Sequence, residues 1–282
     1  MFECALEEMK KSGLPHWGPK SFQGYCKDSG VKAPKTADYI SIDSRKSLAP
    51  ELRNAQCMVF RLGAPEGERN THFGLAKCSH GWGDYFLLDD TLFGSLAPEV
   101  FIPTVSFRHL FPFYLLPEFT ETSLVNLALA SGLMAHALGL DEQTLPLATA
   151  TGQSTHTFRF RPRIGMEEPW THSRGQVEID SLFIARRGGK ETVFIVESKA
   201  AGELDSLAKH KLLYPLLAIR GKVPHYMPVI PVYLRVVQRE DGYHFYFAEC
   251  ELAKRADGDL PVLTGLQAVS QKHFVLRLFQ GL

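Results

Sequence analysis

Residues 176–199 read QVEIDSLFIARRGGKETVFIVESK, two apolar runs joined by a Gly-Gly pair. A Gly-Gly pair between such runs favours the two-residue turn of a β-hairpin. The partner numbers of that hairpin add up to 377, so we expect Asp180 opposite Glu197 and Glu178 opposite Lys199. Because strand side chains alternate between faces, these four charged groups should share one face.

Two carboxylates that face each other across a strand pair repel, and they destabilise the pair unless positive charge lies between them. Asp180 and Glu197 therefore predict a bound divalent cation, with Mg²⁺ expected and Mn²⁺ able to substitute. We expect the carbonyl oxygen of Ser198 and the carboxylate of Glu121 as further metal ligands. Lys199 would orient a water molecule or hold a phosphate, so the predicted catalytic residues of this phosphodiesterase-like centre are Asp180, Glu197 and Lys199.

An alternative interpretation is an ordinary ion pair at a solvated sheet edge, which contributes little to stability. The hairpin is too apolar for an edge position, however, and strands that are apolar on both faces lie in sheets covered by helices on both sides. We expect one face to carry Val177, Ile179, Phe183, Phe194 and Val196, and the other to carry Leu182, Ile184, Val193 and Ile195.

The element order predicts an α/β (α+β) fold with a central mixed sheet. Expected are a buried helix over 121–138, strands over 154–163, 176–185 and 192–199, a helix over 205–220 with Pro215 inside it, and strands over 227–238 and 243–251. A proline-rich stretch near residue 103 predicts two parts, an N-terminal α/β extension (1–103) and a catalytic domain (104–282).

The composition is that of an ordinary globular protein, with a formal net charge of zero. Residues 151–222 nevertheless carry a net charge of +4, so the segment with the acidic centre is also basic. Five scattered cysteines, and no leader-like or membrane-spanning segment, favour a cytoplasmic protein. A zinc site is a further possibility, but its candidate ligands match no common spacing: Cys57, His72, Cys78 and His80.

The order of elements, with Asp180 on one strand and Glu197-Ser198-Lys199 on the next, resembles the PD-(D/E)xK nuclease superfamily. The resemblance covers residues 118–240 and implies a restriction-endonuclease-like core. Ile179 stands where the superfamily's name has proline. On the following helix, His210 and Tyr214 resemble a Gln-x-x-x-Tyr motif, with histidine in place of glutamine.

The resemblance implies a type II restriction endonuclease that cuts double-stranded DNA, leaves 5′-phosphate ends and acts as a homodimer, with a separate DNA methyltransferase protecting the host. Residues 1–103 would then help to read bases. A repair or recombination nuclease of the same fold, or an inactive DNA-binding protein, is the alternative. The residues expected to contact DNA are Arg159, Arg161, Arg163, Lys209, Lys211 and Tyr214, with the three arginines sharing one strand face.

Overall fold

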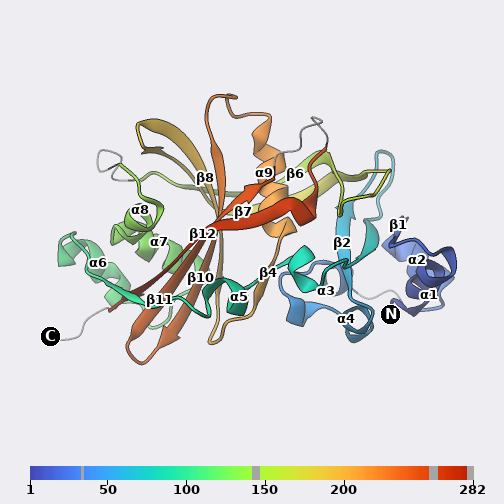
Figure 1. The fold of residues 1–282 in the computed structure, drawn as a ribbon, viewed down its shortest axis with the longest axis horizontal. Helices are drawn as coiled ribbons and strands as arrows, with labels where there is room; N and C mark the ends of the chain where they lie inside the picture. Colours follow the sequence, from blue (N-terminus) through green and yellow to red (C-terminus); the bar gives the residue numbers. More distant parts are fainter. Residues whose placement is uncertain (33–34, 142–146, 254–259, 278–282) are drawn as a thin grey trace.

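The computed structural model describes residues 1–32, 35–141, 147–253 and 260–277, and Figure 1 shows their arrangement. The N-terminal third consists of short elements, as its frequent Gly and Pro residues predict. Its helices are α1 (Glu3–Ser12), α2 (Phe22–Asp28), α3 (Ala37–Ile40), α4 (Pro50–Asn54) and α5 (Asp89–Phe93). Its strands are β1 (His16–Ser21), β2 (Cys57–Gly63), β3 (His72–Lys77), β4 (Phe86–Leu88) and β5 (Glu99–Phe101).

The rest of the chain has longer strands, and it contains most of the elements that form the candidate site. Its helices are α6 (Phe107–Tyr114), α7 (Glu121–Ala130), α8 (Leu133–Leu138) and α9 (His210–Arg220). Its strands are β6 (Ala150–Phe160), β7 (Trp170–Arg187), β8 (Lys190–Ala200), β9 (Ser206–Ala208), β10 (Val229–Arg239), β11 (Gly242–Leu252) and β12 (Leu266–Leu276).

The described strands form one ten-stranded mixed sheet in the order β1-β3-β2-β7-β8-β10-β11-β12-β5, with β6 beside β7, and a small sheet of β4 and β9. Strands β6, β7 and β8 are antiparallel neighbours, whereas β8 and β10 are parallel. The connection between β8 and β10 contains α9, because parallel neighbours need a crossover and a helix is its usual form. No helix of the described residues is long and apolar enough to cross a membrane.

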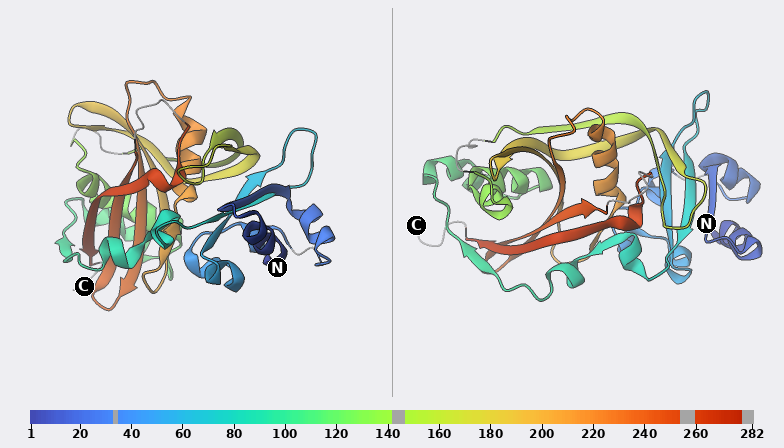
Figure 2. Two further views of the ribbon diagram at one scale, coloured as in Figure 1. Left: turned by 45° about the vertical axis from the view of Figure 1, so that its right-hand side comes forward. Right: turned by 45° about the horizontal axis from the view of Figure 1, so that its top comes forward.

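Strand β8 is buried on both faces. Val193 and Ile195 pack into the core beneath α9, whereas Phe194 and Val196 pack into the core beneath α7 and α8. Figure 2 shows α7 and α8 (green) and α9 (orange) separated by the strands. The prediction that the hairpin lies in the middle of a sheet flanked by helices is therefore confirmed.

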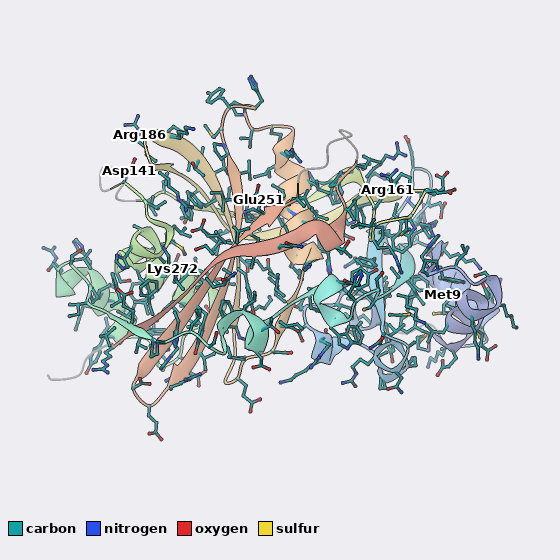
Figure 3. All side chains as sticks on the ribbon, viewed as in Figure 1. Met9, Asp141, Arg161, Arg186, Glu251 and Lys272 are labelled. Carbon is teal, nitrogen blue, oxygen red and sulfur yellow. The ribbon has the colours of Figure 1, made fainter. Side chains whose placement is uncertain are left out.

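The turn of the hairpin is held from outside by Asp141. Gly188 and Gly189 have φ angles of 57° and 78°, and a two-residue turn of type I′ requires positive φ at both positions. Their amide groups donate to the two carboxylate oxygens of Asp141, at 3.1 and 3.0 Å. The amide of Asp141 donates to the carbonyl of Arg186 at 2.9 Å, and Figure 3 shows both side chains at this end of the hairpin.

Strand β7 contains a β-bulge at Asp180–Ser181. Its ladder with β6 pairs Ile179 with Gly152 but Leu182 with Ala150, so two residues of β7 oppose one residue of β6. A bulge bends the strand and re-aims the side chains around it. The bulge therefore includes Asp180, one of the two predicted metal-binding acids.

The bulge also reverses the alternation of side chains along β7, which corrects one prediction. Val177 and Ile179 pack with the core beneath α9, whereas Phe183 packs with the core beneath α7 and α8. The expectation that these three residues share a face is wrong because one extra residue shifts the period of two. Ile184, expected to be buried, is 54% exposed.

Two predicted helices differ in their bounds. The helix expected over 121–138 is broken after Ser131, where Gly132 has a φ of 81° and separates α7 from α8. The N-cap of α7 is Thr120, whose hydroxyl accepts the amide of Ser123 at 3.2 Å. The helix expected from residue 205 begins at His210, because the preceding residues form β9 against β4.

The N-terminal region joins the central sheet through a close contact between β2 and β7. Gly63 pairs with Ser173 in parallel, and a Cβ atom on Gly63 would lie only 2.1 Å from the carbonyl oxygen of Ser173. Position 63 requires glycine for a second reason, because its φ of 71° lies in the left-handed region that side chains disfavour. Strand β5 pairs with β12, so the sheet spans the boundary expected at residue 103.

We predict that Gly63→Ala lowers the free energy of unfolding by about 3 kcal/mol or more, because both the backbone conformation and the close approach exclude a side chain. Gly67→Ala is the matched control: its φ is 80°, but no atom lies within 4 Å of the added Cβ. The control should cost only about 1 kcal/mol. Urea denaturation of both variants measures the difference, and equal costs would contradict the role of the contact.

Candidate metal and phosphodiester site

The hairpin register is the predicted one, and it ends where the candidate site begins. The ladder between β7 and β8 runs from Arg187–Lys190 to Ser181–Val196, with partner numbers adding up to 377 throughout. Beyond Ser181 the strands part. At that point the Oδ2 atom of Asp180 accepts a hydrogen bond from the backbone amide of Ser198 at 2.9 Å. A carboxylate therefore replaces the next rung of the ladder and turns toward β8.

Glu197 and Lys199 follow on β8, and their charged ends meet. The Lys199 Nζ lies 3.4 Å from the Glu197 Oε1 and 3.5 Å from the Glu121 Oε2. Glu121, in the first turn of α7, also accepts the backbone amide of Ala200 at 3.1 Å through Oε1. The helix start is thereby tied to the end of β8, and Lys199 bridges two carboxylates.

Glu197 is 4% exposed, and its environment disfavours a second negative charge. Burial, and after it the nearby Asp180 carboxylate, raise its pKa to about 8 against the smaller opposing effects of Lys211 and Lys199. Burial lowers the pKa of Lys199, but Glu197 and Glu121 outweigh it and the net shift is upward. Bound positive charge would allow both carboxylates to be ionised.

The charged side chains of the site form a charge cluster that consists of Glu121, Asp180, Glu197, Lys199, Lys211 and Asp43. The sequence alone gives no sign that Asp43 belongs to it. Asp43 lies between α3 and α4, and its Oδ1 is 2.7 Å from the Lys211 Nζ on α9. Burial raises the pKa of Asp43, but the charge of Lys211 outweighs it, so the pKa is lowered. No spacing rule links residue 43 to residue 211; only the docking of the N-terminal region on α9 brings them together.

The expected pairing of Glu178 with Lys199 is not found. Glu178 is exposed and accepts the side-chain amide of Gln176 at 2.8 Å, while its backbone pairs with Gln153 of β6. The strands have already separated at this point of β7, so the hairpin register no longer places residue 178 opposite residue 199. Lys199 pairs with Glu197 and Glu121 instead.

The three arginines expected on one strand face are not arranged as a stripe, because β6 ends at Phe160. Arg159 is exposed within the strand. Arg161 lies beyond it and its backbone bonds to Pro261 and Leu263, and Arg163 donates to the carbonyl of Lys77 at 2.9 Å. Of the three, Arg159 is the one that lies on the strand surface as predicted.

The residues expected to contact DNA from the start of α9, Lys209, Lys211 and Tyr214, are largely inside the protein. Lys209 is 5% exposed, and burial lowers its pKa to about 8. Tyr214 is 6% exposed, and its ring lies 4.6 Å from the ring of His172 and 5.2 Å from that of His210. Lys211 is held by Asp43, so each of these side chains faces the interior or the charge cluster.

The donor set at the site is small. Among the described residues no group of three or more His, Cys, Asp and Glu side chains is arranged to hold a metal ion. Asp180 and Glu197 still fit Mg²⁺, which in proteins commonly takes one or two carboxylates and completes its shell with water and substrate phosphate. All five cysteines are free thiols, and four of them are buried.

Comparison with known proteins places this site within a family. Residues 101–274, more than half of the chain, match the family described as "Domain of unknown function (DUF6997)". The chain belongs to this family. The matched region contains all of the site except Asp43. No curated protein and no solved structure matches the chain.

We predict that burial of Glu197 gives the metal-free protein a characteristic pH dependence. Since the pKa is raised from 4.5 to about 8, folding favours the protonated carboxyl group. The resulting stabilisation is complete below about pH 4.5 and is lost as the pH rises to about 8. In Glu197→Gln this loss should be absent, so the melting-temperature difference between variant and parent should widen in favour of the variant from pH 5 to pH 9.

Thermal unfolding in EDTA measures this difference, with Glu191→Gln, an exposed position on the same strand, as control. Parallel pH profiles for the parent and Glu197→Gln would contradict the raised pKa.

Proposed function

We propose that this protein is a Mg²⁺-dependent endonuclease of the PD-(D/E)xK type that hydrolyses phosphodiester bonds of double-stranded DNA. One observation carries the proposal: Asp180 and the buried Glu197 converge beside Lys199 where β7 and β8 part. Two acids and a lysine at the end of central strands are the groups that this chemistry needs.

The topology supports the same assignment. Helix α7, the antiparallel strands β6, β7 and β8, the crossover helix α9 and the parallel strand β10 follow one another as expected for a restriction-endonuclease-like core. The second strand of this series carries Asp180 and the third carries Glu197 and Lys199. The first helix contributes Glu121, which reaches the site through Lys199 and the amide of Ala200.

In this proposal Asp180, Glu197 and the carbonyl oxygen of Ser198 would hold the cation. When bound, Mg²⁺ supplies a Lewis acid for the phosphate and lowers the pKa of bound water. The ammonium group of Lys199, fixed between two carboxylates, orients the attacking water and offsets negative charge on the phosphate. Glu121 positions Lys199 and completes the charge balance.

The further assignment to type II restriction rests on the resemblance. It comprises action as a homodimer on symmetric sites, 5′-phosphate products and a separately encoded protecting methyltransferase. Discrete fragments from plasmid DNA would support restriction. Cutting confined to junctions or ends would instead identify a repair or recombination nuclease.

We predict that Asp180→Ala, Glu197→Ala and Lys199→Ala each lower the Mg²⁺-dependent cleavage rate of plasmid and phage DNA by about 100-fold or more. Each substitution removes a charge that acts directly on the metal or the phosphate. The control variant is Glu191→Ala. Glu191 lies on β8 with Glu197 and Lys199, but it is exposed and paired with Arg186, so this variant should cut at the parental rate.

Circular dichroism spectra of the variants exclude unfolding as the cause. Parental cleavage by Glu197→Ala and Lys199→Ala, or equal cleavage in EDTA, would overturn the proposed function.

A further inference from the structure

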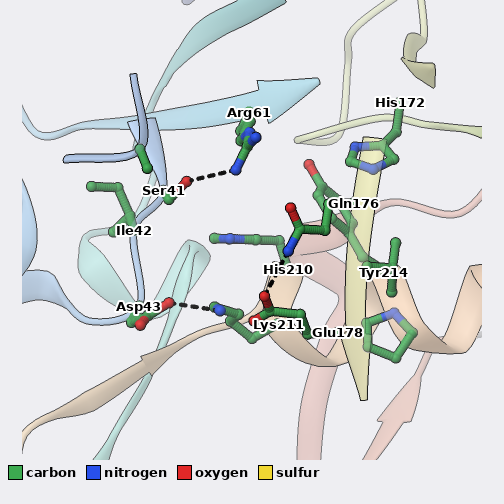
Figure 4. A pocket seen from close by; sticks show the side chains of 13 residues that line it. Ser41, Ile42, Asp43, Arg61, His172, Gln176, Glu178, His210, Lys211 and Tyr214 are labelled. Atoms are coloured by element: carbon green, nitrogen blue, oxygen red, sulfur yellow. Dashed lines mark hydrogen bonds and ion pairs between the residues drawn. The ribbon is translucent and has the colours of Figure 1, made fainter. Parts of the chain in front are cut away.

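A cavity of about 350 Å³ lies beside the charge cluster, between the N-terminal region and the catalytic core. In Figure 4, Ser41 and Asp43 lie on one side of it, His172 and Tyr214 lie on the other, and Glu178 and Lys211 lie between them. The remaining lining residues are Ala37, Ile42, Arg61, Gln176, Val177, His210 and Pro215.

Among the described residues, both ring nitrogens of His172 in the wall of this cavity have no hydrogen-bond partner, and neither have two further buried polar groups, Nδ1 of His210 and the hydroxyl of Tyr214. Their side chains belong to residues that are only 8% and 6% exposed. A buried polar atom left without a partner costs about 1–3 kcal/mol, so both groups are suited to a ligand that supplies the missing bonds.

Both groups are electrically neutral near pH 7. Burial, and after it the charge of Lys211, lower the pKa of His210 to about 3. Burial also raises the pKa of the Tyr214 hydroxyl far above its usual range. Neutral donors and acceptors recognise an uncharged polar edge.

The cavity walls suit a flat aromatic ring. The His210 ring lies 5.2 Å from that of Tyr214, the His172 ring lies 4.6 Å from it, and Ile42 and Pro215 add apolar surface. Polar side chains stand beside these rings: Arg61, which donates to the Ser41 hydroxyl at 3.2 Å, and the bonded pair Gln176 and Glu178. Aromatic walls with amide, carboxylate and guanidinium groups recognise heteroaromatic bases.

The cavity adjoins the proposed catalytic site. Glu178 and Gln176 line it and precede Asp180 on β7 by two and four residues, which is about 7 and 13 Å along a strand. Lys211 lines the cavity and also acts electrostatically on Glu197. A nucleotide whose base entered the cavity would therefore carry its own phosphate close to the two carboxylates.

We propose that this cavity binds one nucleobase of the substrate, extruded from the base stack next to the bond that is cut. This inference rests on the proposed function and adds the conformation of the DNA that the site accepts. A paired base cannot enter the cavity, so binding to duplex DNA includes the cost of unpairing and unstacking one nucleotide. DNA in which that base is already unpaired avoids the cost.

The test compares two 24-base-pair duplexes in EDTA, where no cutting is needed: one fully paired, and one with a single bulged 2-aminopurine. The parent should bind the bulged duplex about tenfold more tightly, and the 2-aminopurine emission should change as the base leaves the stack. Tyr214→Phe, which removes only the hydroxyl group, should reduce the preference about threefold or more. Ala37→Trp, which fills the cavity, should abolish it.

Ala97→Trp adds the same ring at an exposed position outside the cavity and should keep the parental preference. Equal affinity for the two duplexes, or a preference unchanged by Ala37→Trp, would overturn the base-binding cavity even if Mg²⁺-dependent cutting is intact. A bulge preference that persists in an Asp180→Ala protein unable to cut would support the cavity independently of catalysis. Failure to bind either duplex would overturn both this inference and the proposed function.

Discussion

The site depends on the repulsion between two carboxyl groups placed where β7 and β8 part. Asp180 is turned toward β8 by the bulge and fixed by the Ser198 amide, while Glu197 is held in the interior beside it. The protein offsets their charge only in part, through Lys211 and Lys199. A buried acid with a raised pKa, such as Glu197, is typical of functional sites.

The N-terminal region contributes to this charge balance, although it lies outside the region that matches the family, which begins at residue 101. Asp43 fixes the ammonium group of Lys211 on α9, and Arg61 brings a second cation to the adjoining cavity. Strand β2 also joins β7 at Gly63. The extension therefore forms one wall of the cavity, which fits a role in recognising the substrate.

Much of the hairpin follows from local rules. The Gly-Gly turn, the register and the central position of β8 are predicted because turn chemistry and alternation act within a few residues. The bulge at Asp180–Ser181 is invisible to the same rules, since a single extra residue leaves no mark on an apolar run. It explains why Val177 and Ile179 lie on the face opposite to the one predicted. The ion pair of Asp43 with Lys211 and the burial of Lys209 depend on docking between distant segments. No local pattern encodes such contacts.

The central claim is that a divalent cation binds between the carboxyl groups of Asp180 and Glu197. Crystals of the protein soaked in Mn²⁺ and measured at the manganese absorption edge test it directly. The account predicts an anomalous peak within about 2.0–2.6 Å of an oxygen of each residue, with Lys199 beside it. No peak there at saturating Mn²⁺, with both carboxyl groups bonded only to protein, would contradict it.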